Sequence, residues 1–169
     1  MSEKLYLPYS DGCFVCGHSN IHGLQVQFYV QDNSVKVDLN FAPHFNSFPH
    51  ITHGGILSSI LDEAMGWSAF IFSDIETFLF TRELNVTYKR NAPIGVPLIL
   101  TAEFVGAERG GMFSTKGKIT DLEGKVITAS KGLFFPTSKE KMAETIPHLS
   151  FLEGYTYHPK AVKYCKIDK

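Results

Sequence analysis

One long apolar segment, residues 54–72, limits what this chain can fold into more than any other feature. Its helical pattern begins at a glycine pair and places apolar residues on nearly every face. A helix that is apolar all round is either buried or crosses a membrane. Two adjacent acids, Asp62 and Glu63, and three serines interrupt the segment, which makes it too polar for a membrane span. We therefore expect a buried helix that other elements enclose.

The enclosing elements are predicted to be β-strands. Before the helix, residues 24–30 and 35–41 alternate apolar and polar side chains with the period of a strand. After the helix, four strand-like runs are separated by turn signals; they cover residues 78–90, 98–108, 112–120 and 125–135. This order predicts an α+β fold in which an antiparallel sheet wraps around one long central helix.

The bulk properties of the chain are those of a globular domain. It has 169 residues, of which 44% are hydrophobic and 20% charged. The formal net charge of −1 gives no general attraction to nucleic acid or to an anionic membrane, so neither is expected as a partner. The start of the chain lacks the apolar stretch of a signal peptide, and three cysteines do not form a full disulfide framework, which favours the cytoplasm. We divide the chain into a domain over residues 1–136 and a tail over residues 137–169 without evident chemistry.

The two acids in the helix need an explanation, because a buried carboxylate is costly unless it is paired, hydrogen-bonded or neutralised. Gly54 and Gly55 start the helix, where free N–H groups and the helix dipole can polarise a carbonyl oxygen. Asp62 comes seven residues after Gly55, on roughly the same face but about 10 Å further along the axis. One carbonyl group cannot contact both, so joint action requires antiparallel helices from two subunits. Alternatively, the acids pair with Arg82 or Lys89, or they face solvent.

Three stretches together resemble a known family. They are "CFVCGHSNIHGLQVQFYV" (13–30), "THGGILSSILDEAMGW" (52–67) and "TRELNVTYKRNAPIG" (81–95). They are similar to the hotdog-fold acyl-CoA thioesterases of the PaaI-like group, and the resemblance covers roughly residues 13–136. It implies a hotdog fold and a homodimer or homotetramer with active sites at the dimer interface. It also implies hydrolysis of an acyl-CoA without a cofactor.

The same resemblance assigns roles to four residues. The acid nine residues after the histidine is the catalytic carboxylate of the family, acting as general base or nucleophile, and here it is Asp62. The amide of Gly54 polarises the thioester carbonyl from the facing subunit. Thr81 matches the residue that holds the water, and Asn46 matches an amide that positions the reactants. Glu63 receives no chemical step.

Residues next to this site are candidates for binding the substrate. His53 and Gly55 form the start of the helix, and His53 is expected to order the glycine turn. Lys89 and Arg90 close the run 78–90, where they can reach the phosphates of coenzyme A. The alternative for both is a solvated strand end.

A metal site has little support in the sequence. Cys13, Cys16, His18 and His22 have the spacing of half a zinc site, but no second Cys-x-x-Cys is present. We therefore expect no metal, and a packed N-terminal turn is the preferred interpretation.

Two other functions compete with hydrolysis. The first is a hotdog dehydratase or hydratase, in which His44 and Asp62 or Glu63 would form the acid–base pair. The second is a non-enzymatic acyl-CoA-binding protein. A serine hydrolase is disfavoured, because the sequence has no Gly-x-Ser-x-Gly elbow.

Overall fold

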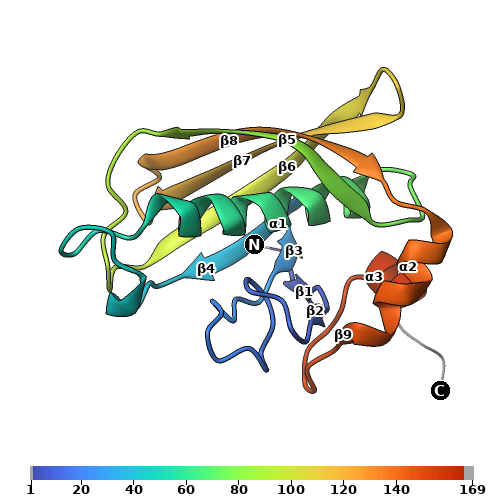
Figure 1. The fold of residues 1–169 in the computed structure, drawn as a ribbon, viewed down its shortest axis with the longest axis horizontal. Helices are drawn as coiled ribbons and strands as arrows, with labels where there is room; N and C mark the ends of the chain where they lie inside the picture. The colour runs from blue at the N-terminus through green and yellow to red at the C-terminus, as the bar shows by residue number, and fades with distance from the viewer. Residues whose placement is uncertain (1, 166–169) are drawn as a thin grey trace.

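A computed structural model of the chain, which describes residues 2–165, has one long helix lying along a curved antiparallel sheet (Figure 1). The helices are α1 (Gly54–Phe72), α2 (Lys139–Thr145) and α3 (Pro159–Cys165), with short 3₁₀ turns η1 (Pro43–Phe45) and η2 (Ile146–His148). The strands are β1 (Leu5–Tyr6), β2 (Tyr9–Ser10), β3 (Tyr29–Gln31), β4 (Ser34–Leu39), β5 (Leu79–Tyr88), β6 (Leu98–Glu108), β7 (Met112–Asp121), β8 (Val126–Pro136) and β9 (Leu149–Ser150). The seven-stranded sheet has the order β1-β3-β4-β6-β7-β8-β5, and β2 pairs with β9 separately. The predicted α+β hotdog architecture is confirmed.

The central helix and the four strands after it lie close to their predicted positions. Residues 24–30 differ, because only their last two residues join strand β3. Gln25 has a φ of 51°, a left-handed conformation that interrupts an extended strand. The N–H groups of Leu24 and Val26 donate instead to the carbonyls of Phe14 and Val15. This segment therefore holds the Cys-containing turn rather than pairing with the sheet.

Small residues let α1 approach the middle of the sheet closely. Gly117 of β7 lies opposite Ala102 of β6, and both are buried. A Cβ atom on Gly117 would lie 2.9 Å from both Leu61 Cδ2 and Met65 Sδ of the helix. The sheet thus has no room for a side chain where the helix crosses it.

Strand β5 forms one edge of the sheet, where its outer backbone groups have no neighbouring strand among the described residues. It is ten residues long, and most of its side chains are exposed, including Phe80 and Tyr88. A long exposed edge of this kind is a ready template for pairing with another strand.

The tail packs at the C-terminal end of α1 (Figure 1). Lys160 Nζ donates to the carbonyl oxygen of Ser73 at 2.7 Å, where the helix dipole favours a cation. The Tyr164 hydroxyl donates to Glu76 Oε1 at 2.6 Å. Tail residues also enter the hydrophobic core; they are Met142, Ala161 and Cys165. No helix in the described part of the chain has the length and hydropathy needed to span a bilayer.

Gly117→Val is expected to destabilise the protein by about 1–3 kcal/mol, since it forces a side chain into the helix–sheet contact. Gly106→Val is the matched control, because a Cβ atom at Gly106 would meet nothing within 4 Å. Urea denaturation of both variants measures the free energy of unfolding. Equal values for the two variants would contradict the close packing inferred here.

Candidate active site

One stripe of α1 faces strand β5, and it carries the residues that the sequence singles out. Gly54, Ser58 and Asp62 follow each other at intervals of four, which places them on one face of the helix. Opposite this face, the Thr81 hydroxyl donates to Asp62 Oδ1 at 2.7 Å. The helix and the edge strand thus bring together the predicted carboxylate and the predicted water-holding hydroxyl.

A β-bulge turns Thr81 toward the helix. Leu84 lies opposite Gly132 on the helix-facing side of the sheet, so strict alternation would place Arg82 on that side and Thr81 on the other. The register shifts between Thr81 and Glu83, and Thr81 pairs with the buried Phe134 instead. Arg82 is the extra residue of the bulge. This irregularity is what allows the Thr81–Asp62 hydrogen bond.

The environment of Asp62 favours a basic carboxylate. Burial raises the pKa of the Asp62 carboxyl above its ordinary value, and the hydrogen bond from Thr81 offsets part of that rise. Among the described residues, no hydrogen bond reaches the second oxygen, Oδ2. One oxygen is therefore held in place while the other is free to accept a proton.

The start of α1 leaves the Gly54 amide available. His53 is the N-cap, and its Nδ1 accepts the N–H of Gly55 at 2.9 Å. Gly54 N–H is one of the orphan donors of a helix start, and no acceptor contacts it within residues 2–165. The sequence groups both glycines at the site, but the Gly55 amide is occupied by His53. Gly54 is thus the glycine whose amide can reach a ligand.

Tyr88, which no sequence motif singles out as a site residue, supports this helix start. Its hydroxyl donates to the Gly54 carbonyl at 2.9 Å and lies 2.5 Å from Ser58 Oγ. A Cβ atom on Gly54 would lie 3.2 Å from the Tyr88 ring. Alternation along β5 from Leu84 could have placed Tyr88 on the helix-facing side, but its partner on the helix could not be read from the sequence.

Asn46 lies in the loop that leads into α1. It pairs with Thr52 through an isolated β-bridge, which fixes the loop two residues before the helix start. Asn46 is exposed, and its side chain forms no hydrogen bond within the described residues. It is therefore close to the helix start in the chain path, with a free amide.

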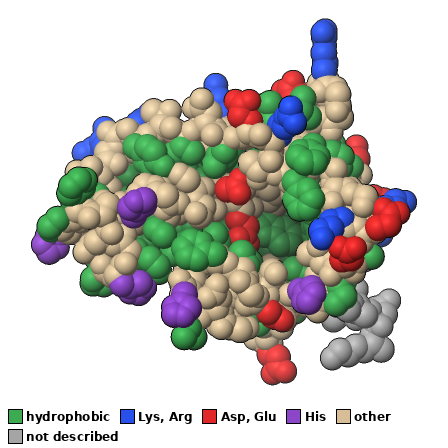
Figure 2. Space-filling view, in the orientation of Figure 1, with side chains coloured by type: hydrophobic (Ala, Val, Ile, Leu, Met, Phe, Trp, Pro, Cys, Tyr) green, Lys and Arg blue, Asp and Glu red, His purple; other side chains and the backbone are tan. Residues whose placement is uncertain are grey.

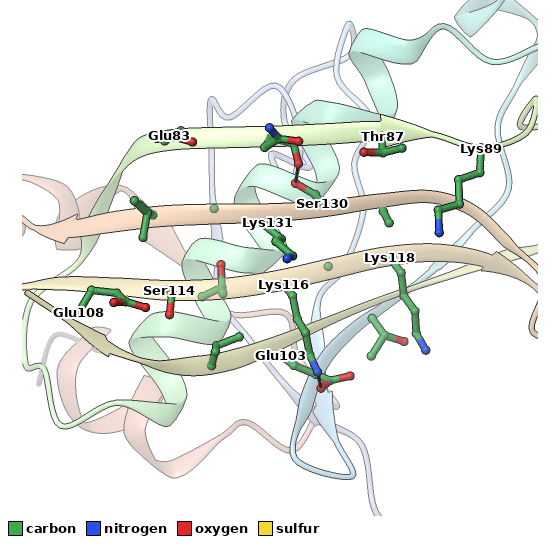
Figure 3. A pocket seen from close by; sticks show the side chains of 18 residues that line it. Glu83, Thr87, Lys89, Glu103, Glu108, Ser114, Lys116, Lys118, Ser130 and Lys131 are labelled. Atoms are coloured by element: carbon green, nitrogen blue, oxygen red, sulfur yellow. Dashed lines mark hydrogen bonds and ion pairs between the residues drawn. The ribbon is translucent and has the colours of Figure 1, made fainter.

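The predicted phosphate-binding residues lie directly after β5. Lys89 lines an open groove on the outer face of the sheet, opposite the helix (Figure 3). The groove carries three more lysines and three glutamates, and one pair of them, Lys116 and Glu103, is joined at 2.9 Å. Arg90 donates to the Val126 carbonyl. Asp62 does not line this groove, so the Asp62–Thr81 pair and the open groove lie on opposite faces of the sheet.

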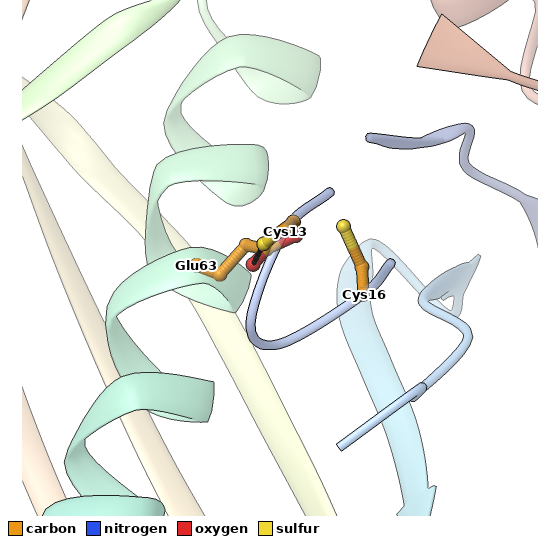
Figure 4. A group of neighbouring side chains, drawn as sticks. All are labelled: Cys13, Cys16 and Glu63. Carbon is orange, nitrogen blue, oxygen red and sulfur yellow. Dashed lines mark hydrogen bonds between the residues drawn. The ribbon is translucent and has the colours of Figure 1, made fainter. Parts of the chain in front are cut away.

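The second acid, Glu63, faces a different part of the chain (Figure 4). Glu63 Oε2 lies 3.2 Å from Cys13 Sγ, and Cys16 Sγ is in the same group. Burial raises the pKa of the Glu63 carboxyl to about 8, and the negative charge of Cys13 adds to the rise. Hydrogen bonds from the Cys16 thiol and from backbone N–H groups lower the pKa of the Cys13 thiol to about 5. No local pattern in the sequence brings these groups together, because 50 residues separate Cys13 from Glu63.

Charged side chains are unevenly spread over the face that exposes α1. Figure 2 shows acidic side chains near the centre of this face and basic side chains toward its edges.

His44, the acid–base candidate of the competing dehydratase, lies in η1 and is exposed. Its ring packs on Phe45 with centroids 4.0 Å apart, and within residues 2–165 it forms no hydrogen bond to either acid.

Comparison with known proteins finds a family model that is similar to the part of the chain that carries this site. The sequence model described as thioesterase superfamily matches residues 50–127, which include Gly54, Asp62 and Thr81. A search of curated proteins gives no significant match.

Solved structures with the same fold agree with that match. A thioesterase superfamily protein superposes with a TM-score of 0.66 and 26% identity, over 73% of this chain and 60% of that one. This chain therefore spans about 60% of the length of that protein. A Bacillus halodurans protein solved with CoA has a TM-score of 0.57 and 26% identity, covering 65% of this chain and 72% of its own. Zebra fish thioesterase superfamily member 2 shares the fold with a TM-score of 0.58 and 18% identity, over 68% and 87% of the two chains.

Asp62→Asn is expected to stabilise the protein relative to wild type at neutral pH, and less so in acid. The pKa of Asp62 is higher in the folded protein than in the unfolded chain. The folded state therefore loses stability as the pH rises from the unfolded-state pKa through the folded-state pKa, because the buried carboxyl must ionise. Asn carries no charge and can still accept the Thr81 hydrogen bond. Denaturation at several pH values measures the difference, with Glu123→Gln in an exposed turn as control. A difference that does not change with pH would contradict the burial cost assigned to Asp62.

Proposed function

We propose that this chain, of which residues 50–127 match the model described as thioesterase superfamily, hydrolyses the thioester of an acyl-CoA. The observation that carries the proposal is the Thr81–Asp62 hydrogen bond, 2.7 Å long, on a helix whose Gly54 amide has no acceptor among the described residues. Thioester hydrolysis needs a base or nucleophile for the attack and a donor for the oxyanion that develops. Asp62 and Gly54 supply these two functions.

The reaction follows from these groups. Asp62 takes a proton from water through its free oxygen, and the water oxygen bonds to the thioester carbon. Alternatively, the carboxylate itself attacks that carbon, the sulfur leaves as a thiolate that solvent protonates, and water then hydrolyses the resulting acyl anhydride to free the acid and Asp62. In the first route the reaction continues as follows. Thr81 fixes Asp62 and can accept a hydrogen bond from the water through its own oxygen. The carbonyl oxygen gains negative charge, which a helix-start amide stabilises. The C–S bond then breaks, and the sulfur leaves as a thiol after it takes up the proton.

The amide and the base come from different subunits in this proposal. Gly54 and Asp62 are eight residues apart on one helix, about 12 Å along its axis, so they cannot serve the same carbonyl. If the exposed β5 edges of two copies pair antiparallel, their α1 helices also run antiparallel. The Gly54 end of one helix then lies toward Asp62 of the other. We therefore propose a homodimer, with pairing of two dimers into a homotetramer as the larger form.

Coenzyme A is the carrier that the surroundings of the site support. The Bacillus halodurans protein was solved with CoA. In this chain, Tyr88 contacts the helix start, and Lys89 and Arg90 follow it directly. Lys89 extends onto the outer face of the sheet at this end of β5 and Arg90 contacts the Val126 carbonyl, and cations of this kind suit the phosphates of coenzyme A. His53 and Asn46 would then order the loop on the other side of the same helix start.

Within the superfamily, we assign this chain to the PaaI-like group, and we place it in the cytoplasm. All three cysteines are free, which is consistent with that reducing compartment. The competing dehydratase requires His44 beside Asp62 or Glu63, whereas its ring packs on Phe45. A non-enzymatic acyl-CoA-binding protein would not need Asp62 oriented by a hydroxyl. Hydrolysis therefore accounts for more of the geometry than either alternative.

Asp62→Asn should reduce thiol release from acyl-CoA substrates by about 10²–10⁴-fold, which is the usual contribution of a positioned acid or base. Thr81→Val should lower the rate less, since water can replace its hydrogen bond. The measurement is free-thiol release over a panel of short, long and aryl acyl-CoAs. Glu83→Gln, an acid on the outer face of the same strand, is the control and should keep the wild-type rate. A normal rate in Asp62→Asn would refute the mechanism.

A mixed dimer tests whether two subunits share each site. Gly54→Pro removes the amide donor, and proline is accepted at the first position of a helix. Because its Cβ would lie 3.2 Å from the Tyr88 ring, circular dichroism must first show that the variant keeps the wild-type fold. Asp62→Asn and Gly54→Pro homodimers should both be inactive. After random exchange, half of the dimers are mixed and each has one intact site of two, so about a quarter of wild-type thiol release should return. If no activity returns although mass spectrometry detects mixed dimers, the site lies within one chain.

A further inference from the structure

We propose that Cys13, Cys16 and Glu63 bind a thiophilic divalent cation of the zinc type. The two sulfur atoms and a Glu63 carboxylate oxygen all lie within 4.8 Å of one another. They come from a turn near the N-terminus and from the middle of α1 (Figure 4). This inference is independent of thioester hydrolysis and assigns a role to the acid that the proposed mechanism leaves unused.

The donor set fits zinc. Thiolate and carboxylate ligands bind tetrahedral zinc at about 2.3 Å and 2.0–2.2 Å, which puts ligand atoms roughly 3.5–3.8 Å apart. Cys13 Sγ and Glu63 Oε2 are already 3.2 Å apart, so small side-chain movements suffice. Magnesium and calcium prefer oxygen ligands and would not select two thiols. Cys13 and Glu63 are half-buried, which leaves access for the ion and for a water as fourth ligand.

The turn that holds the two cysteines is built for anionic sulfur. The backbone N–H of Val15 donates to Cys13 Sγ at 3.3 Å, and the N–H of Ser10 donates to Cys16 Sγ at 3.4 Å. Gly17 allows the tight bend, since a Cβ atom there would lie 2.5 Å from the Cys13 carbonyl oxygen. Each sulfur thus accepts a backbone hydrogen bond, but the neighbouring Cys13, burial and Glu63 raise the pKa of the Cys16 thiol, so that thiol gives up its proton only to a bound cation.

A cation also resolves the cost of placing Glu63 in this helix. A carboxylate taken out of water needs a strong partner, and apart from the 3.2 Å contact with Cys13 Sγ, none of the ion pairs among residues 2–165 includes Glu63. His18 and His22, which follow the two cysteines in the sequence, do not supply a ligand to this cation site. His18 Nε2 lies 3.3 Å from Gln27 Oε1, and His22 is exposed. The third ligand is therefore Glu63 of the central helix.

An ion at this position would join the N-terminal turn to α1, one residue from Asp62 but on a different side of the helix. Asp62 faces Thr81 of β5, whereas Glu63 faces the turn. The site is consequently a cross-link between two segments rather than part of the thioester chemistry.

Cobalt titration of the full chain, purified under reducing conditions and freed of metal, tests the site directly. Cobalt bound to two thiolates should give near-ultraviolet charge-transfer bands and the visible bands of a tetrahedral ion, and zinc should displace them. Saturating zinc should raise the melting temperature by about 5–10 °C. Zinc should also protect Cys13 from alkylation, as followed by mass spectrometry.

Three variants separate the site from general thiol binding. Cys16→Ser should lose half of the charge-transfer intensity, because one thiolate remains. Glu63→Gln should weaken cobalt binding by more than about tenfold, since even outer-shell partners contribute 10–100-fold to metal affinity. Cys165→Ala removes the remote buried cysteine and should bind cobalt as wild type does. The proposal is overturned if wild type shows no thiolate bands, if Cys13 is alkylated equally fast with and without zinc, or if Glu63→Gln binds cobalt normally.

Discussion

The burial of one face of α1 against the sheet is the constraint on which the rest of the structure depends. An apolar α1 gains stability only if the sheet curves around it and approaches it closely. Gly117 and Ala102 provide that approach, and Leu61 and Met65 fill the contact. Because the helix is fixed on its core side, its two remaining flanks are fixed as well. Any polar group on those flanks is held at a defined position.

The two adjacent acids use these two flanks. Successive residues of a helix point about 100° apart, so Asp62 and Glu63 face different neighbours. Asp62 meets the hydroxyl of Thr81 on the edge strand, and Glu63 meets the thiol of Cys13 in the N-terminal turn. In both places burial raises the pKa of the carboxyl, because the charged form loses its contact with water. The same helix thus creates two sites with different chemistry.

Strand β5 connects the proposed catalysis with the proposed assembly. Its inner face supplies Thr81 to the carboxylate and Tyr88 to the helix start. Its free edge offers ten residues of backbone to a second copy. A strand that both forms the wall of the site and pairs with a partner makes the site depend on the dimer. In the proposed dimer, a donor and a base about 12 Å apart on one helix would serve one carbonyl group, because each comes from a different subunit.

Hydrophobic periodicity in the sequence predicted most of the secondary structure, namely helix α1 and strands β4 to β8. This was possible because apolar residues repeat with a period of 3.6 in a helix and 2 in a strand when one face of the element is buried. The spacing from His53 to Asp62 and Thr81 likewise carried the resemblance to a thioesterase. Three features were decided by tertiary structure. The bulge at Arg82 reverses the face of Thr81, the conformation of Gln25 ends a strand that alternation predicts, and the turn of Cys13 reaches Glu63. Each depends on contacts between segments far apart in the chain, and local periodicity contains no information about such contacts.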